Sequence, residues 1–366
     1  MSDVKPLVLK SGSFVEIGTG DLLKIPGVKF PDNSSQNFAF TDGDKGEITV
    51  SASGATWTID NGAVTPSKLS AGAGTWAATN VQTLGIATSD AAVPSAGNVN
   101  FFMGSQGGKP TFGWRTANGR VTYAQTNLGS SKITMYLPTP GNTNFTVIGG
   151  QGLTVGGTAT ARTPNATNMV TSTKRAGSVS AATAGALAYF VQQNANSHHM
   201  LGNGSGVGGF FKVTRFACTD VATVAGARQF VGMLPQSTPT NVEPSALLNC
   251  MGVGNGAADS NLKIFYGGSA AQTPIDLGAN FPANTLGVDL YELILYSDPY
   301  VNNAVYYRVT RLNTGHVAEG TLTGTAGVAL PSSSTMLAAG SAWRSNNATA
   351  LAVALDLIME YIETYV

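Results

Sequence analysis

Hydrophobic and polar residues alternate along much of the chain, and Gly, Pro and Asn interrupt the pattern every few residues. A period of two is typical of half-buried β-strands, whereas a period near 3.6 would indicate helices. Many short strands separated by Gly and Asn turns predict an all-β protein, either a sandwich or a barrel. The runs that carry this pattern are residues 48–52, 133–137, 210–217, 262–266, 286–296 and 305–312.

The C-terminal segment allows two interpretations. Asp356, Glu360 and Glu363 would share one face of a helix. The alternation of apolar and polar residues that is typical of a strand extends over more residues than the helical pattern. We therefore expect a strand that completes the sandwich. The apolar positions of that strand are Leu351, Val353, Leu355, Leu357, Met359 and Tyr361.

Charge excludes some partners. The 366 residues include 20 basic and 20 acidic side chains, so the formal net charge is zero. A neutral chain lacks the basic surface of a nucleic-acid binder, and we expect no nucleic-acid partner. No apolar run approaches the ~20 residues that span a bilayer, so we expect no membrane insertion. The N-terminal residues also show no basic-then-apolar leader pattern.

The cysteines and histidines point to no metal or cofactor. Cys218 and Cys250 are each flanked by apolar residues, which favours buried reduced thiols, with a disulfide between them as the alternative. The adjacent His198 and His199 favour a solvated loop, because neighbours on a strand face opposite sides. His316 lies in the turn-like stretch NTGHVAEG. No GxSxG, HExxH, P-loop or EF-hand motif occurs, and we expect no cofactor and no metal site.

Carboxylates are the remaining candidates for catalysis. In a glycosidase, two of them would have to meet across the scissile bond. No spacing selects a pair, so solvated charge is the simpler interpretation and we expect no enzymatic activity. The candidates are Asp289, Glu292, Asp298, Glu319, Asp356, Glu360 and Glu363.

Composition divides the chain into four segments. Residues 1–46 are rich in Pro, Asn, Ser and Gly, so we expect them to be ordered against another protein. Residues 47–75 alternate, and residues 76–160 combine short strands with Gly-rich turns into a middle β domain. Over residues 161–366 the apolar runs lengthen, which predicts a self-contained antiparallel β-sandwich.

The N-terminal part resembles the neck of bacteriophage fibre proteins. The resemblance lies in GDKGEITV at residues 43–50, in SGATWTIDNGAVTPSKLSAG after it, and in FVEIGTGDLLKIPGV upstream. A lone hairpin of this size cannot bury both faces, whereas three copies around an axis could. The resemblance implies a homotrimeric neck over 47–75 and a virion-attachment segment over 1–46 that contacts tail, baseplate or capsid proteins. The expected trimer axis consists of Ile48, Val50, Trp57, Ile59, Val64 and Leu69.

The C-terminal part resembles the lectin-like jelly-roll (concanavalin-like) domains at fibre tips. Matching pieces include GGFFKVTRFACTDVATVAGARQFVGM, VYYRVTRLNTGHVAEGT and ALDLIMEYIETYV. The resemblance implies a structural protein on the virion surface whose distal domain recognises a host cell-surface glycan. A purely structural head-decoration or baseplate protein is the first alternative, and a polysaccharide-degrading spike is the second.

Loops at the ends of a sandwich are where binding residues usually lie. Tyr306 and Tyr307 fall inside an apolar strand and are expected in the core, whereas SDPYVNN and SAWRSNNA are typical of loops. The aromatic residues of these loops would stack on sugar rings, and Asn and Arg would bind hydroxyl groups. A buried Trp343 is the alternative. The expected ligand contacts are Tyr300, Asn302, Trp343, Arg344, Asn346 and Asn347.

Overall fold

The structure is a computed structural model of residues 1–366, and it divides into two units, residues 1–82 and residues 83–366. In the first unit the described residues are 7–10, 13–16, 28–29, 35–36, 43–44, 46–52, 56–60 and 63. In the second unit they are 92–124, 132–138, 145–148, 153–192, 199–235, 238–338 and 340–364.

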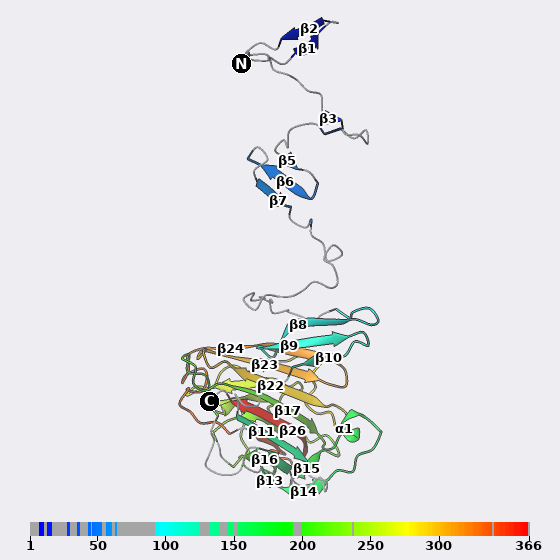
Figure 1. The fold of residues 1–366 in the computed structure, drawn as a ribbon. Coiled ribbons are helices and arrows are strands. Elements are labelled where there is room, and N and C mark those ends of the chain that lie inside the picture. Colours follow the sequence, from blue (N-terminus) through cyan, green and yellow to red (C-terminus); the bar gives the residue numbers. More distant parts are fainter. Residues whose placement is uncertain are drawn as a thin grey trace. The chain divides into compact units, whose positions relative to one another are not determined.

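The first unit contains short antiparallel strands (Figure 1). Pairing occurs even within residues 1–46, where the sequence indicated little regular pattern. The strands are β1 (Leu7–Lys10) with β2 (Ser13–Glu16), β3 (Val28–Lys29) with β4 (Ser35–Gln36), and the three-stranded sheet of β5 (Gly43–Asp44), β6 (Ile48–Ser51) and β7 (Thr56–Ile59).

The β6–β7 hairpin lies within the stretch that resembles a fibre neck. Ile48 lies opposite Ile59, and Val50 lies opposite Trp57. Val50 is only 1% exposed, whereas Trp57 and Ile59 are 53% and 61% exposed. A single hairpin therefore leaves large apolar side chains in water, which is the condition that motivated the trimer prediction. Val64 and Leu69, the other expected axis residues, lie outside the described residues, and the trimer stays a prediction.

The second unit is built around two large sheets in which every strand pair is antiparallel (Figure 1). One, here called the β26 sheet, has the order β12-β11-β26-β17-β22-β23-β24, and β15 pairs with both β26 and β14. Its strands are β11 (Lys132–Pro138), β12 (Phe145–Ile148), β14 (Thr158–Ala161), β15 (Ala176–Val179), β17 (Phe210–Cys218), β22 (Tyr291–Ser297), β23 (Ala304–Arg311), β24 (His316–Thr323) and β26 (Ala354–Thr364).

The other, here called the β25 sheet, has the order β13-β16-β25-β18-β19-β20-β21. Its strands are β13 (Leu153–Gly156), β16 (Leu187–Gln192), β18 (Arg228–Met233), β19 (Cys250–Asn255), β20 (Lys263–Gly267), β21 (Ile275–Asp276) and β25 (Ser341–Ser345). Helical structure among the described residues is limited to α1 (Met169–Ser172), which Asn168 caps, and one 3₁₀ turn (Pro244–Ala246).

One hydrophobic core fills the space between the two sheets. Phe210 and Phe216 of β17 and Leu293 of β22 contribute from the β26 sheet, and Met251 and Ile264 contribute from the β25 sheet. All five side chains are fully buried. The alternating pattern places these residues on the inward face of each strand. The predicted all-β, antiparallel sandwich is confirmed.

The sandwich begins earlier in the chain than residue 161. Thr134 of β11 lies opposite Ile362 of β26, and Val155 of β13 lies opposite Phe190 of β16. The boundary at 161 was placed where the apolar runs lengthen. That criterion missed short strands whose partners lie far along the chain, so β11, β12, β13 and β14 belong to the sandwich and not to a separate middle domain.

A three-stranded sheet forms a further layer of the second unit (Figure 1). It has the order β10-β9-β8, with β8 (Val99–Gln106), β9 (Lys109–Thr116) and β10 (Val121–Tyr123). The β8–β9 turn contacts the outer face of the β26 sheet at Ile294 and Tyr306. A Cβ atom on Gly108, which has a φ of +92°, would lie 2.1 Å from Cγ of Tyr306. The absence of a side chain thus lets the turn approach the sheet closely.

Most of the predicted strands in the sandwich are present. Residues 210–217 and 305–312 correspond to β17 and β23, and the C-terminal segment is a strand and not a helix. The last strand begins at Ala354, three residues after Leu351. The run from 286 is shorter than expected, because Leu286 has a φ of +50° and β22 starts only at Tyr291.

The cysteine prediction is confirmed, and the solvated-loop prediction is wrong for His199, whereas His198 lies outside the described residues. Cys218 and Cys250 are both buried free thiols. His199 is only 2% exposed, because its backbone forms a β-bridge with Leu337 that draws it into the protein. The stretch NTGHVAEG does begin in a turn, at residues 312–315, and His316 directly follows it as the first residue of β24.

Candidate functional site

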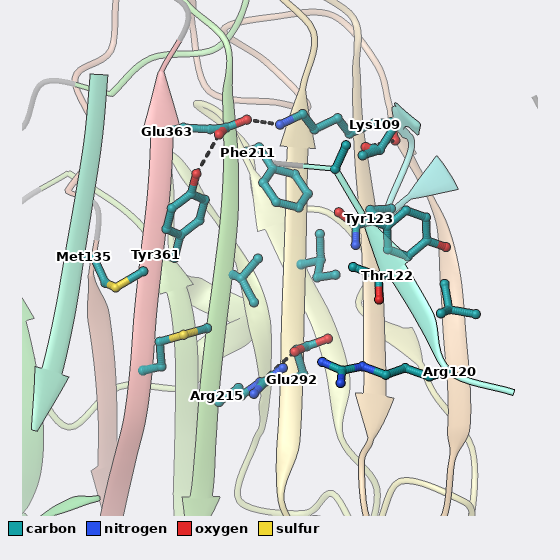
Figure 2. Close-up of a pocket in the computed structure, with 17 residues that line it drawn as sticks. Lys109, Arg120, Thr122, Tyr123, Met135, Phe211, Arg215, Glu292, Tyr361 and Glu363 are labelled. Carbon is teal, nitrogen blue, oxygen red and sulfur yellow. Dashed lines mark hydrogen bonds and ion pairs between the residues drawn. The ribbon is translucent and has the colours of Figure 1, made fainter. Parts of the chain in front are cut away.

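A pocket of about 490 Å³ lies between the three-stranded sheet and the outer face of the β26 sheet (Figure 2). Strands β9 and β10 form one wall, and β11, β17, β22 and β26 form the other. The first wall contributes Lys109, Thr111, Val121, Thr122 and Tyr123, with Gln106, Arg120 and Ala124 beside them. The second wall contributes Met135, Phe211, Val213, Arg215, Glu292, Ile294, Met359, Tyr361 and Glu363.

Strand alternation explains why these side chains meet. On β17, Phe210 and Phe216 belong to the core between the sheets, while Phe211 belongs to a separate cluster on the outer face. Successive side chains of a strand face opposite sides, so Val213 and Arg215 line the pocket next to Phe211. The outer face of the β26 sheet is therefore partly apolar and is covered by the three-stranded sheet.

One end of the pocket is a charged cluster around Glu363. Its carboxylate forms an ion pair with Lys109 Nζ and accepts a hydrogen bond of 2.7 Å from Tyr361 Oη. The Lys109 ammonium also lies 4.5 Å from the ring centroid of Phe211, in cation–π geometry. Burial lowers the pKa of Lys109 to about 8. This end therefore contains a cation that is already engaged on two sides.

The opposite end contains two guanidinium groups. Arg215 Nε is 2.7 Å from Glu292 Oε2, and Arg120 points into the pocket toward this pair (Figure 2). The backbone of Arg120 is fixed in the β9–β10 turn: its N–H donates to Asn118 Oδ1 at 3.1 Å, and its carbonyl accepts from the Thr116 N–H at 3.1 Å. The backbone of Arg120 is therefore held in place, whereas its side chain can adapt to a ligand.

Apolar and aromatic side chains fill the space between these two ends. Met135, Val213 and Ile294 line the β26-sheet wall, and Tyr123 lines the other. The Tyr123 ring packs edge-on against Phe102, with the ring centroids 5.9 Å apart. The pocket thus combines apolar surface with polar groups at both ends, which suits a ligand that has both characters.

The residues that the structure describes show no group of three His, Cys, Asp or Glu side chains placed to bind a metal ion. Within the same residues, no helix has the length and apolar character needed to cross a membrane.

Two of the sequence-predicted ligand contacts lie on an exposed turn. Tyr300 and Asn302 are between β22 and β23, and Tyr300 is 72% exposed. The Tyr300 N–H donates to Asp298 Oδ1 at 2.8 Å, which orders the turn. Neither residue lines the pocket. These two side chains remain accessible, and their contact with a ligand stays a prediction.

The loop placement of Trp343 and Arg344 is wrong. Both lie in β25, a central strand of its sheet with every residue buried. Trp343 is 1% exposed and stacks on Phe230, with the ring centroids 6.3 Å apart. Arg344 is fully buried, and its Nη2 is 2.5 Å from Asp220 Oδ2. The alternative in which Trp343 is a core residue is therefore correct.

The two asparagines that follow β25 serve the structure of the loop. The Asn346 side chain is fully buried and donates to the carbonyls of Thr183 and Leu351 at 2.9 and 2.8 Å. Asn347 has a φ of +53°, and its carbonyl accepts from the Gly185 N–H. Asn346 is not available to a ligand here, and the structure does not bring these residues together with Tyr300.

Sequence reasoning missed the pocket, although one signal was present. The outward positions of β17 and β26 include Phe211, Val213 and Tyr361, which is more apolar surface than a solvated sheet face needs. That excess indicates a covering element. It does not reveal which segment supplies the cover, since Lys109 and Glu363 are 254 residues apart.

No family model and no curated protein matches this chain. Among solved structures, peanut lectin with a nine-residue peptide is similar at 10% identity and a TM-score of 0.41, over 64% of this chain and 97% of that one. A protein of unknown function from Shewanella oneidensis MR-1 is 12% identical with a TM-score of 0.40, over 66% and 90%. Lectin UEA-II complexed with galactose is 11% identical with a TM-score of 0.38, over 58% and 92%. The fold assignment rests on the strand pairing described above.

Proposed function

We propose that the second unit binds carbohydrate and that the ligand occupies the pocket between the three-stranded sheet and the β26 sheet. The observation that carries the proposal is the combination, in one open pocket, of aromatic side chains with charged groups at both ends. A sugar ring has apolar C–H faces that stack on aromatic rings and hydroxyl groups that pair with carboxylates and guanidinium groups. The volume falls within the range of small-molecule sites, about 300–1,000 Å³.

The ion pairing favours binding over catalysis. A glycosidase needs one carboxyl group that donates a proton and a second that acts as base or nucleophile. Both carboxylates that line the pocket are engaged: Glu292 with Arg215, and Glu363 with Lys109 and Tyr361. Neither is left over as a proton donor. A polysaccharide-degrading spike is therefore the weaker alternative.

A glycan array with the full chain tests this proposal. We expect Tyr361→Ala to weaken binding at least tenfold by removing one ring and one hydroxyl group from the pocket. Tyr300→Ala is the matched control, because it removes an exposed tyrosine outside the pocket. Glu292→Gln, which preserves the side-chain volume, is a second change in the pocket for the case that Tyr361→Ala does not fold. Loss of binding in Tyr300→Ala alone would move the site to the β22–β23 turn.

We further propose that the chain is a bacteriophage fibre protein on the virion surface, where the second unit recognises the host. Support comes from the resemblance of residues 43–72 to a fibre neck and from the exposed Trp57 and Ile59 on that hairpin. In this proposal residues 47–75 hold a homotrimer together and residues 1–46 attach it to the virion. A head-decoration or baseplate protein without a host ligand is the alternative.

Sedimentation of the full chain tests the trimer. We expect a trimer mass, and we expect Ile59→Asp to shift the protein toward a monomer, because three carboxylates at one axis would lose hydration. Thr58→Asp on the same strand is the control for an added charge. A monomer mass for the unaltered chain would contradict the neck assignment.

A further inference from the structure

We infer that the ligand of this pocket is an acidic saccharide, one whose carboxylate or sulfate group is bound by Arg120; the inference rests on the proposed carbohydrate-binding function. The charges of the pocket carry it. The lining includes three basic side chains, Lys109, Arg120 and Arg215, and two acidic ones, Glu292 and Glu363. One positive charge is left over.

The ion pairs identify Arg120 as the residue that supplies this charge. Lys109 pairs with Glu363, and Arg215 pairs with Glu292. Among the residues that the structure describes, no carboxylate lies within 4 Å of the Arg120 guanidinium to form an ion pair. The arrangement leaves Arg120 available, while the other two cations are committed to protein partners.

The position of Arg120 suits an anion at the rim of the pocket. Its backbone is held by hydrogen bonds in the β9–β10 turn, and its side chain points toward the Arg215–Glu292 pair (Figure 2). A guanidinium group offers two parallel N–H donors that match the two oxygens of a carboxylate or sulfate. Glu292 would repel an anion placed deeper, so the acidic group binds at Arg120 while the neutral part of the sugar occupies the apolar middle of the pocket.

The test uses the full chain and an array of matched saccharides. Each neutral saccharide is paired with one in which a hexose is replaced by its uronic acid, and with one that carries a sulfate group. We expect tighter binding of the acidic members, and the two acidic sets distinguish a carboxylate from a sulfate ligand. The preference for acidic saccharides should decrease when the salt concentration is raised from about 0.05 to 0.5 M, because screening weakens exposed charge pairs.

Three variants separate the role of Arg120 from general charge. Arg120→Gln should weaken binding of acidic saccharides about tenfold, equivalent to about 1.4 kcal/mol, and leave neutral ones unchanged. Arg120→Lys should retain part of the preference. Lys174→Gln removes the same charge from an exposed position outside the pocket and should change nothing. Since Arg120 is exposed, thermal unfolding should be the same in all three variants.

Each other outcome overturns a defined statement. Equal affinity for acidic and neutral saccharides overturns the acidic ligand and leaves the proposed function intact. A preference that survives in Arg120→Gln overturns the assignment to Arg120. Binding of no saccharide at all overturns the proposed function and this inference together.

Discussion

Strand β26 carries two lysine–glutamate pairs on opposite faces, and they differ in their surroundings. Glu360 faces the β25 sheet, where a Cβ atom on Gly340 would lie 2.5 Å from its Oε1. Its partner is Lys212 Nζ, at 3.0 Å, and both side chains are buried. Glu363 faces outward and pairs with Lys109 at the pocket. The same chemistry thus occurs once in the core and once in the wall of the pocket, where the Lys109 side chain is 9% exposed and the Glu363 side chain 1%.

The environment of each pair decides what it can do. Burial lowers the pKa of Lys212 and raises the pKa of Glu360, so the core opposes the charged form of both groups. Their mutual attraction favours the ionised forms, as does the contact of Thr214 with Glu360, and such a pair serves structure. Water in the pocket can hydrate Lys109 when its partner changes. Charge in the core is fixed, whereas charge in the pocket can respond to pH and to ligands.

The largest expected effect comes from breaking the core pair. Lys212→Met leaves the Glu360 carboxylate buried without a partner and should lower the free energy of unfolding by about 3–5 kcal/mol. Chemical denaturation measures this. The double variant Lys212→Met/Glu360→Leu should regain most of the loss, because apolar side chains replace both charges. A loss below about 1 kcal/mol in the single variant would mean that water reaches this pair.

A smaller effect is expected at the pocket. Glu363→Gln removes the carboxylate but preserves its shape, and should cost about 1–2 kcal/mol, since the pocket can hydrate the freed ammonium. Glu360→Gln, the same substitution three residues earlier, is the matched control and should cost more. Equal losses in the two variants would contradict a role of the pocket in hydrating Lys109.

A third effect is a pH dependence that comes from Lys109. The folded chain releases this proton near pH 8, whereas the unfolded chain holds it up to about 10.5. The unfolded state therefore binds more protons in this interval, so the Lys109 contribution to the free energy of unfolding should rise from about pH 8 to 10.5. Subtracting the same titration of Lys109→Met isolates it. A contribution that falls with pH would show that attraction to Glu363 affects the pKa of Lys109 more than burial does.

The sequence predicted those parts of the fold in which one strand face is buried. The alternation of β17 and β23 is clear, and β26 was assigned correctly because its pattern extends over many residues. β25 was missed because both of its faces are buried, which removes alternation. Its Ser, Ala and Arg content resembled that of a loop. A buried Arg344 could not be expected from the local sequence, because its partner Asp220 is 124 residues away.

The candidate site was less predictable than the fold. Tyr300 was correctly placed on a turn, yet the pocket depends on the contact of two segments that no local pattern connects. Gly107 and Gly108 let the β8–β9 turn approach Ile294 and Tyr306, and the next residue, Lys109, pairs with Glu363. The spacing of residues along the chain contains no information about this contact.

The position of β26 has a consequence for synthesis of the protein. This strand pairs with β11, β15 and β17, yet it is the last strand of the sandwich to leave the ribosome. Until residue 364 has emerged, the edges of β11 and β17 lack their partner, and open strand edges invite association with other chains. We therefore expect an interval during synthesis in which these edges are open to other chains, and it ends when β26 closes the sheet.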